Sequence, residues 1–355
     1  ISVRLLNPLV RPAARTVSHA TPDETSEYAG ALLKLGAVTE AEELLSGINA
    51  TATPQAMLYL AFAKFARWDY TGAIPHLKQY AASDRIDEYQ RQIGSLNLGA
   101  ALVHERRNEE ALEVLGSLRE RLEKTAHDRL LSNVLLCLAE LEIERDNMTH
   151  GERLISQAEA KLKDAEGLDS FFVTKWRAIS TFKKSPEGNA EVLGAIKQLA
   201  LKQAHWETVR DCDRYLACGL KDKSLFEKLY FGTQHESFRQ MIVKDWGQSV
   251  EMGSTYLWQL QPGKRTVDLL SLENSEYGLK EGQLLFRLSA TLVSDFYRPF
   301  RLAELHAAVF PGDYYNPITS PLRVHQAIFR LRRLLSSKHC PVTVEETRKA
   351  YRFAA

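Results

Sequence analysis

One short segment near the C-terminus carries side chains that suit nucleic-acid recognition. Leu322–Ser336 reads LRVHQAIFRLRRLLS, with four arginines and one glutamine. A guanidinium group can pair bidentately with a guanine edge or clamp a phosphate, and a glutamine amide can pair with adenine. We expect groove contacts from the first three of these polar residues and phosphate contacts from the last two. In order, they are Arg323, Gln326, Arg330, Arg332 and Arg333.

The apolar residues of the same segment predict the element that positions these groups. Val324, Ile328, Leu331 and Leu335 recur at the three- and four-residue spacing of a helix with one buried face. Pro321 suits the first helical turn, where its missing N–H group is not needed. A solvated amphipathic helix is the alternative interpretation of this pattern. The segments on either side of this helix favour the interpretation that it binds DNA.

The sequence contains none of the common catalytic signatures. It has no nucleophile elbow, no glycine-rich phosphate loop, no HExxH pair and no paired catalytic carboxylates. The four cysteines are scattered without a CxxC pair, which favours reduced thiols in the cytoplasm and argues against a zinc site. No apolar run approaches the roughly 18 residues of a membrane span. We therefore expect a cytoplasmic, non-enzymatic protein without metal, cofactor or membrane partner.

Charge is unevenly distributed along the 355 residues, although the net charge is only +1. From Glu281 to the C-terminus there are 11 Lys or Arg against 6 Asp or Glu, so the preceding part of the chain is net acidic. A basic end on an acidic body suggests a polyanionic partner at that end. The length predicts two or three domains.

The first twenty residues carry three arginines and no acidic residue. A transit peptide, a short arm and an expression remnant all fit this composition. Pro8 interrupts the apolar run, and we favour an arm over residues 1–20.

Between Thr21 and Trp246 the apolar spacing predicts almost continuous helix, with a weak internal repeat. Large–small pairs such as Leu60-Ala61 and Leu98-Gly99 are each followed, twelve positions after the small member, by another small residue. The interval between these later small residues lengthens along the chain; they are Ala41, Ala73, Ala111 and Gly151.

This pattern resembles the tetratricopeptide repeat, although the period drifts above that of the family, which is about 34 residues. The resemblance implies an α-solenoid whose concave groove holds a protein or peptide partner. Helix–helix packing alone is the competing explanation for the inward-facing residues. The candidates for partner contacts are Leu58, Phe62, Phe65, Asn97 and His104.

After Trp246 the pattern changes to a mixture of strands and helices. Two strands around a tight turn come first, followed by two helices, a polar loop, the arginine-rich helix and a terminal strand pair. This order is typical of a winged helix-turn-helix. The predicted strands are Thr255–Leu260, Thr266–Leu272, Val342–Glu345 and Ala350–Phe353, and the first two predicted helices are Glu281–Phe296 and Arg301–Phe310.

The segment Thr266–Phe353 resembles the C-terminal DNA-binding domain of OmpR/PhoB-type response regulators. The likeness lies in the strand TVDLLSL, the second-helix sequence FRLAEL with its VFPG ending, the RLRRL helix and the closing YRF strand. It implies that Arg348 and Lys349, in the wing, contact phosphates or the minor groove. The wing departs from the family, because Arg348-Lys349-Ala350-Tyr351 replaces Gly-x-Gly-Tyr. Response regulators of this family carry a receiver domain before the DNA-binding domain, and in this sequence the predicted helical repeats occupy that place.

Together these features predict a mainly α protein in which a tetratricopeptide-like α-solenoid precedes an α+β winged helix-turn-helix. The expected domains are an arm over 1–20, the repeat over 21–245 and the winged helix over 246–355. The expected function is that of a transcriptional regulator that binds double-stranded DNA and a protein or peptide partner, and a homodimer would suit paired half-sites. The alternative is a non-catalytic signalling scaffold in which the winged helix docks a protein.

Overall fold

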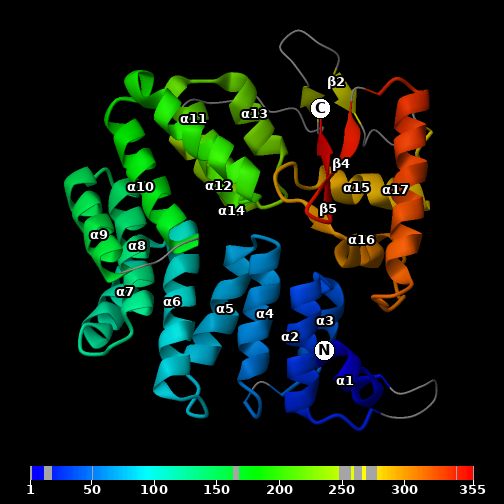
Figure 1. Ribbon diagram of the computed structural model, residues 1–355, viewed down its shortest axis with the longest axis horizontal. Helices are drawn as coiled ribbons and strands as arrows, with labels where there is room; N and C mark the ends of the chain where they lie inside the picture. Colours follow the sequence, from blue (N-terminus) through cyan, green and yellow to red (C-terminus); the bar gives the residue numbers. More distant parts are fainter. Residues whose placement is uncertain are drawn as a thin grey trace. The chain divides into compact units, whose positions relative to one another are not determined.

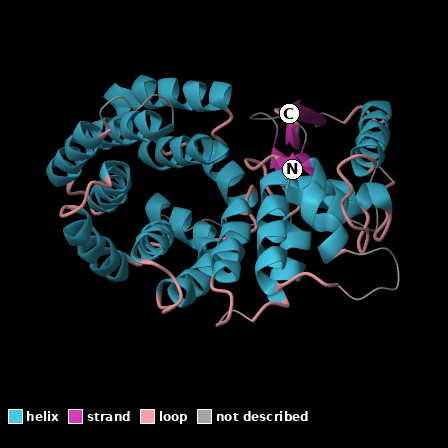
Figure 2. Ribbon diagram, turned by 60° about the horizontal axis from the view of Figure 1, so that its bottom comes forward, coloured by secondary structure: helices cyan, strands magenta, loops and turns pink. Residues whose placement is uncertain are grey.

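The computed structural model describes residues 2–11, 18–49, 51–162, 168–247, 257–259, 266–268, 278–340 and 342–354. The described chain is mainly helical, with 72% helix, and it carries a small three-stranded antiparallel sheet near the C-terminus (Figure 1). Colouring by secondary structure shows how little strand there is beside the helices (Figure 2). The prediction of a mainly α fold is confirmed.

The chain forms two compact units. The first comprises Ile1–Lys34 and Ala41–Ile196, and the second comprises Leu35–Glu40 and Lys197–Ala355. The division falls within helix α11, well before the change of sequence pattern at Trp246. The three helices that follow α11 therefore share a compact unit with the C-terminal strands and helices.

Helices occupy nearly all of the described chain up to Trp246, as the apolar spacing predicts. From α4 to α10, each helix packs against the next one along the chain. The bounds are α2 (Pro22–Leu35), α3 (Val38–Ser46), α4 (Gln55–Ala66), α5 (Tyr70–Ala81), α6 (Glu88–His104), α7 (Asn108–Leu122), α8 (Asp128–Glu144), α9 (Met148–Lys161), α10 (Leu168–Lys184) and α11 (Pro186–Gln203).

Part of the segment expected to be an arm forms a helix, α1 (Ser2–Val10), despite Pro8. The Tyr28 hydroxyl donates a hydrogen bond to Asn7 Oδ1 at 2.9 Å, and the Arg11 guanidinium lies 5.6 Å from the centre of the Tyr28 ring. α1 is therefore held against α2. The rest of the predicted arm includes residues 12–17, which lie outside the described residues.

Small residues let the helices of the first unit approach one another closely. Ala41, Ala73 and Ala111 are fully shielded from solvent, and Gly151 is buried. A Cβ atom added to Gly151 would lie 2.7 Å from Ile143 Cγ1. A side chain at that position would therefore push α9 away from α8.

The turns after α4, α6 and α8 share one backbone geometry. In each turn one non-glycine residue has positive φ, namely Trp68 (60°), Arg106 (53°) and Asp146 (62°). The next N–H then donates to the carbonyl five positions earlier, as in a Schellman C-cap. The residue with positive φ comes five positions before a small residue of the sequence repeat in each case, namely Ala73, Ala111 and Gly151. The bonds run from Asp69 to Lys64, from Arg107 to Leu102 and from Asn147 to Glu142, at 3.0, 2.9 and 2.8 Å.

The second unit continues with three helices and then a mixed α and β segment. Its three-stranded sheet is antiparallel in the order β3-β5-β4, and β1 pairs with β2 in a separate ladder. The bounds are α12 (Trp206–Leu220), α13 (Lys223–Phe231), α14 (Glu236–Trp246), β1 (Leu257–Gln259), β2 (Thr266–Asp268), α15 (Leu284–Val293), β3 (Phe300–Arg301), α16 (Leu302–Val309), α17 (Ser320–Ser337), β4 (Thr343–Thr347) and β5 (Ala350–Ala354).

The order of these elements follows the sequence-based expectation, with two differences. Phe300 and Arg301, expected to begin a helix, form the short strand β3, and Phe300 pairs with Tyr351 of β5. The segment between β4 and β5 is shorter than expected, since only Arg348 and Lys349 lie between the strands. The predicted turn at 261–264 lies outside the described residues.

The apolar face of α17 is buried as its spacing predicts. Val324, Ile328, Leu331 and Leu335 are each exposed by 2% or less. α17 packs against α15, α16 and β4, so these side chains close the core of the C-terminal segment. Burying four such side chains is worth roughly 1.5–3 kcal/mol each before entropy is counted, which fixes the opposite face of α17 toward solvent.

Candidate functional site

The exposed face of α17 brings together three of the residues expected to contact DNA. At roughly 100° per residue, Gln326, Arg330 and Arg333 share the side opposite the buried stripe, and all three are exposed. The side chains of Gln326 and Arg330 make no hydrogen bond or ion pair with any other described residue. The Arg333 guanidinium lies 5.9 Å from the centre of the Phe329 ring. These polar groups are available to a ligand.

Arg323 is exposed but is held at the start of the helix. Its Nη1 lies 2.8 Å from Asp313 Oδ2, and its guanidinium lies 3.8 Å from the centre of the Phe310 ring. The ion pair neutralises its charge locally. Arg323 would contact a base only after releasing Asp313.

Arg332 points toward the terminal hairpin instead of the centre of the exposed face. Its Nε donates to the Val344 carbonyl at 2.9 Å, and its guanidinium lies 6.0 Å from the centre of the Tyr351 ring. His325 lies on the same side, 6.2 Å from the Tyr351 ring. Arg332 therefore links α17 to β4 and has fewer donors left for a phosphate.

The turn between β4 and β5 holds the two remaining candidates. Thr347 pairs with Ala350, so Arg348 and Lys349 form a two-residue hairpin loop in which both φ angles are positive, 48° and 65°. Such loops prefer Asn-Gly, and a left-handed conformation costs another residue roughly 1–2 kcal/mol. Two cations thus stand where glycine would be more stable.

The two cations of this turn differ in their contacts. Arg348 Nη2 donates to the Lys202 carbonyl at 3.3 Å. Lys349 is exposed and has no ion pair with another described residue. In the following strand, the Arg352 guanidinium lies 4.3 Å from the centre of the Trp206 ring. The hairpin is therefore partly engaged with α11 and α12, and Lys349 is the freer cation.

In the first unit, an aromatic row of Tyr59, Phe62, Phe65, Tyr70 and His104 runs from α4 across α5 to α6. Successive ring centroids lie 6.4, 6.4, 5.5 and 4.1 Å apart, and Tyr70 and His104 are stacked. All five rings are half-buried. The row thus combines three of the predicted partner-contact residues with two that the sequence reasoning missed.

The other two partner candidates are placed differently. Leu58 is only 6% exposed and belongs to the helix packing. The Asn97 amide donates to the Ile93 carbonyl of its own helix at 2.8 Å, so it is not directed at a ligand. Tyr70 would have been a better candidate for partner contact than Leu58 or Asn97. It is the first residue of α5, its ring contacts Phe65, and it stacks on His104.

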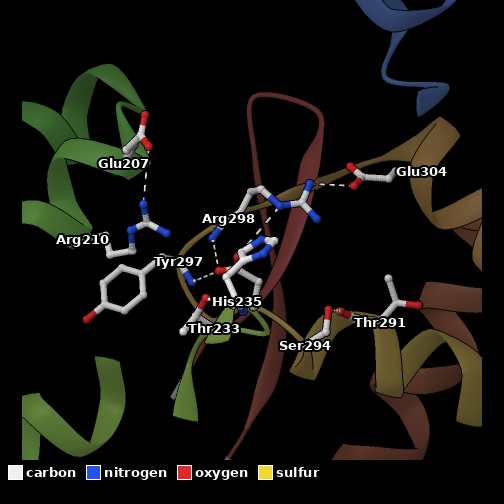
Figure 3. A network of polar contacts seen from close by, with 10 residues as sticks. Glu207, Arg210, Thr233, His235, Thr291, Ser294, Tyr297, Arg298 and Glu304 are labelled. Atoms are coloured by element: carbon white, nitrogen blue, oxygen red, sulfur yellow. Dashed lines mark hydrogen bonds and ion pairs between the residues drawn. The ribbon is translucent and has the colours of Figure 1, made fainter. Parts of the chain in front are cut away.

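Within the second unit, a buried polar network joins α12 to the loop between α15 and β3. Figure 3 shows the part of this network around Arg298 and Glu304. Asp295 Oδ1 accepts hydrogen bonds from the backbone N–H groups of Tyr297 and Arg298, at 2.9 and 2.8 Å. Arg298 Nη1 pairs with Glu304 Oε1 at 2.6 Å. The Tyr297 hydroxyl donates to Asp213 Oδ2 of α12 at 2.9 Å. Segments far apart in sequence are therefore tied through hydrogen bonds.

Burial and neighbouring charges shift the pKa values of Asp295 and Tyr297 in this network. Burial raises the pKa of Asp295, although Arg298 opposes this shift. Burial, together with the Asp213 carboxylate, raises the pKa of Tyr297 well above its ordinary value. Lys197 forms an ion pair with Asp213. Figure 3 shows Arg210 and Glu207, also from α12, beside the network.

No metal centre is formed by the residues that the structure describes, since no three His, Cys, Asp or Glu side chains are grouped to hold an ion. Burial raises the pKa of Cys137 to about 12, so that thiol is protonated near neutral pH. None of the described helices combines the length and apolar character needed to cross a bilayer.

Comparison with models of known protein families, with curated proteins and with solved structures gave no match. The resemblances to tetratricopeptide repeats and to OmpR/PhoB-type domains therefore stay predictions that rest on the residues themselves.

Proposed function

We propose that the chain is a transcriptional regulator that binds double-stranded DNA through α17 and the β4–β5 turn. The exposed face of α17 carries this proposal, because Gln326, Arg330 and Arg333 face solvent above a fully buried apolar stripe. No Asp or Glu occurs from Tyr314 to Val344, so α17 itself carries no side chain that repels phosphates. Such a face suits guanine edges and the phosphate backbone. In this proposal α15–α17 and the three-stranded sheet form an OmpR/PhoB-like winged helix, with β4 and β5 as its wing.

The contacts of each cation divide their roles within this proposal. Arg330 and Gln326 are the base readers, since both are exposed and unengaged. Arg333 and Lys349 contact phosphates. Arg323, held by Asp313, orients the start of the helix, and Arg332 braces the wing against α17 through the Val344 carbonyl.

The repeat region is proposed to be a tetratricopeptide-like solenoid that holds a protein or peptide partner. The recurring turn and the buried small residues support this architecture. The aromatic row is its candidate contact surface, because half-exposed rings supply apolar area with little loss of conformational entropy.

Fluorescence anisotropy with a random-sequence duplex at about 50 and 200 mM salt tests the DNA-binding proposal. Binding should weaken steeply with salt, because phosphate contacts release counterions. Replacing Arg330 and Arg333 together by alanine should weaken binding at both salt concentrations. The matched control replaces Arg119 and Arg121 of α7, which removes the same charge from the other unit. An effect of the control equal to that of the α17 variant would show that only net charge matters.

Two single substitutions separate base reading from phosphate contact. Arg330→Ala should cost about 1–3 kcal/mol on a selected sequence and relax specificity there, whereas Lys349→Ala should weaken binding to every sequence alike. Equal losses for Arg330→Ala on selected and random DNA would remove Arg330 from the base readers.

The alternative is a scaffold in which the C-terminal segment docks a protein. One observation favours it, namely that Arg348 and Arg352 of the hairpin already contact Lys202 and Trp206 within the same unit. Absence of duplex binding by the full chain at low salt would support this alternative.

A further inference from the structure

Large apolar side chains are exposed on α17 and in the loop that precedes it. Ile318 and Tyr314, in the loop before the helix, are 77% and 66% exposed. Leu322 and Phe329, on the helix itself, are 63% and 60% exposed. Concentrated exposure of this kind marks a binding surface more often than chance, because water disfavours such side chains.

Leu322 and Phe329 share the solvent side of α17 with the proposed base readers. They are separated by two helical turns, or about 10.5 Å along the axis. Gln326 lies between them, and Arg330 and Arg333 follow Phe329. The helix thus offers apolar and hydrogen-bonding groups in alternation along one face.

We propose that Leu322 and Phe329 read the 5-methyl groups of thymines in the DNA major groove, so that the chain prefers sites with thymines about three base pairs apart. This inference rests on the proposed DNA-binding function. Base steps of about 3.4 Å match the spacing of the two side chains when α17 lies along the groove. The thymine methyl is the apolar group that a base presents in the major groove, and phenylalanine and small apolar groups contact it.

The charge pattern selects DNA over a protein as the occupant of this face. Arg330 and Arg333 lie among the apolar residues of this face, and a protein partner would have to supply matching acidic groups, whereas a duplex presents phosphates at every base step. The acid-free stretch from Tyr314 to Val344 fits a polyanion. An apolar contact surrounded by guanidinium groups suits base edges bordered by phosphates.

Replacing thymine by deoxyuridine tests this inference, because only the methyl group is lost. The full chain would first enrich a preferred sequence from a random duplex library, and that duplex would then be synthesised with thymine or with deoxyuridine. Affinity should fall roughly fourfold per contacted methyl, since burying one such carbon is worth about 0.8 kcal/mol and about 1.4 kcal/mol is tenfold.

Variants locate the contact. Phe329→Ala and Leu322→Ala should each weaken binding to the thymine duplex and abolish the loss caused by deoxyuridine at one position. Arg330→Ala should weaken binding to both duplexes and preserve their ratio. Leu220→Ala, which removes an exposed leucine from α12, is the control and should change neither affinity.

The outcomes distinguish this inference from the function on which it rests. Equal affinity for thymine and deoxyuridine duplexes, with steep salt dependence retained, would overturn thymine reading and leave DNA binding intact. Failure to bind any duplex at about 50 mM salt would overturn both.

Discussion

At the scale of single residues, the buried side chain of His306 is expected to make the stability of the C-terminal segment depend on pH. It is fully shielded in α16, its two ring nitrogens have no hydrogen-bond partner among the described residues, and it packs against Phe310 and Tyr315. Burial lowers its pKa, Arg323 lowers it further, and Asp313 opposes the shift. The imidazole is therefore held neutral.

Acidification should weaken the fold through His306. Its pKa is lower in the folded than in the unfolded state, so the unfolded chain binds more protons once the pH falls below the usual value of about 6.5. The stability contributed by the neutral imidazole is full above that pH and is lost as the pH falls. In urea unfolding at pH 7.5 and 5.0, His306→Phe should lose less stability between the two pH values than the unmodified chain.

The control for this measurement is His325→Phe, which changes an exposed imidazole of α17. It should keep the pH dependence of the unmodified chain. An unchanged pH dependence in His306→Phe would mean that other groups control the acid response.

At the scale of elements, Gly99 sets the distance between α6 and α7. A Cβ at Gly99 would overlap the side chain of Leu115, which is fully buried, whereas nothing lies within 4 Å of a Cβ added to Gly116. Alanine normally stabilises a helix interior by about 0.5–1 kcal/mol relative to glycine. Gly116→Ala should therefore raise the free energy of unfolding, and Gly99→Ala should lower it by about 1–3 kcal/mol through overpacking. Denaturant titration would show opposite signs, and stabilisation by both would refute close packing at Gly99.

Changing the residues of the β4–β5 turn should stabilise the fold and weaken DNA binding at the same time. Arg348 and Lys349 both have a left-handed backbone conformation, which Asn and Gly adopt at lower cost. Replacing Arg348-Lys349 by Asn-Gly should therefore raise the free energy of unfolding by about 1 kcal/mol or more. The same change removes two cations, so the salt slope of DNA binding should fall by about one for each phosphate that the turn no longer touches.

The double alanine variant at Arg348 and Lys349 is the matched control for this change. It removes the charges without relieving the turn, so it should lose affinity without gaining stability. If the Asn-Gly variant bound DNA as tightly as the unmodified chain, the turn would have no part in binding.

The sequence predicts elements better than it predicts contacts between distant segments. The helices up to Trp246 and α17 follow from three- and four-residue spacing, because each buries one continuous face. β3 was not predicted because a strand of two residues has no detectable periodicity. Phe300 is in a strand because its backbone pairs with Tyr351 of β5, which is distant in sequence.

The candidate site shows the same limit. The exposure of Gln326 and Arg330 follows from the phase of one helix, so the sequence predicts it. The engagement of Arg323 by Asp313 and of Arg332 by Val344 depends on how loops return to α17, and the spacing of residues within the helix does not reveal it. Tyr70 and His104 meet only after α5 and α6 pack together.

At the scale of the whole molecule, the second compact unit depends on hydrogen bonds that join α12 and the end of α13 to the C-terminal segment. Tyr297 donates to Asp213, a fully buried carboxylate that also pairs with Lys197. The Phe296 N–H donates to the Gly232 carbonyl at 3.0 Å. We expect α12–α14 and α15–β5 to unfold together.

Tyr297→Phe tests this cooperativity. It leaves Asp213 without its hydroxyl donor and should cost about 1–3 kcal/mol. Hydrogen exchange should then increase in α12 and α15 together and stay unchanged in α4–α9. The control, Tyr59→Phe, removes an exposed hydrogen bond to Glu27 and should have little effect. Faster exchange in α15 alone would show that the two parts unfold separately.

The recurring turns at Trp68, Arg106 and Asp146 also bear on how the chain could change in length. Each turn closes its helix by the same backbone hydrogen bond, and the packing in this part of the chain runs chiefly between neighbouring helices. A segment cut at two equivalent turns therefore begins and ends in the same conformation. Duplicating the stretch from Trp68 to Arg106 would join two turns of the same backbone geometry, so gene duplication could lengthen this part of the chain by one helix pair at a time.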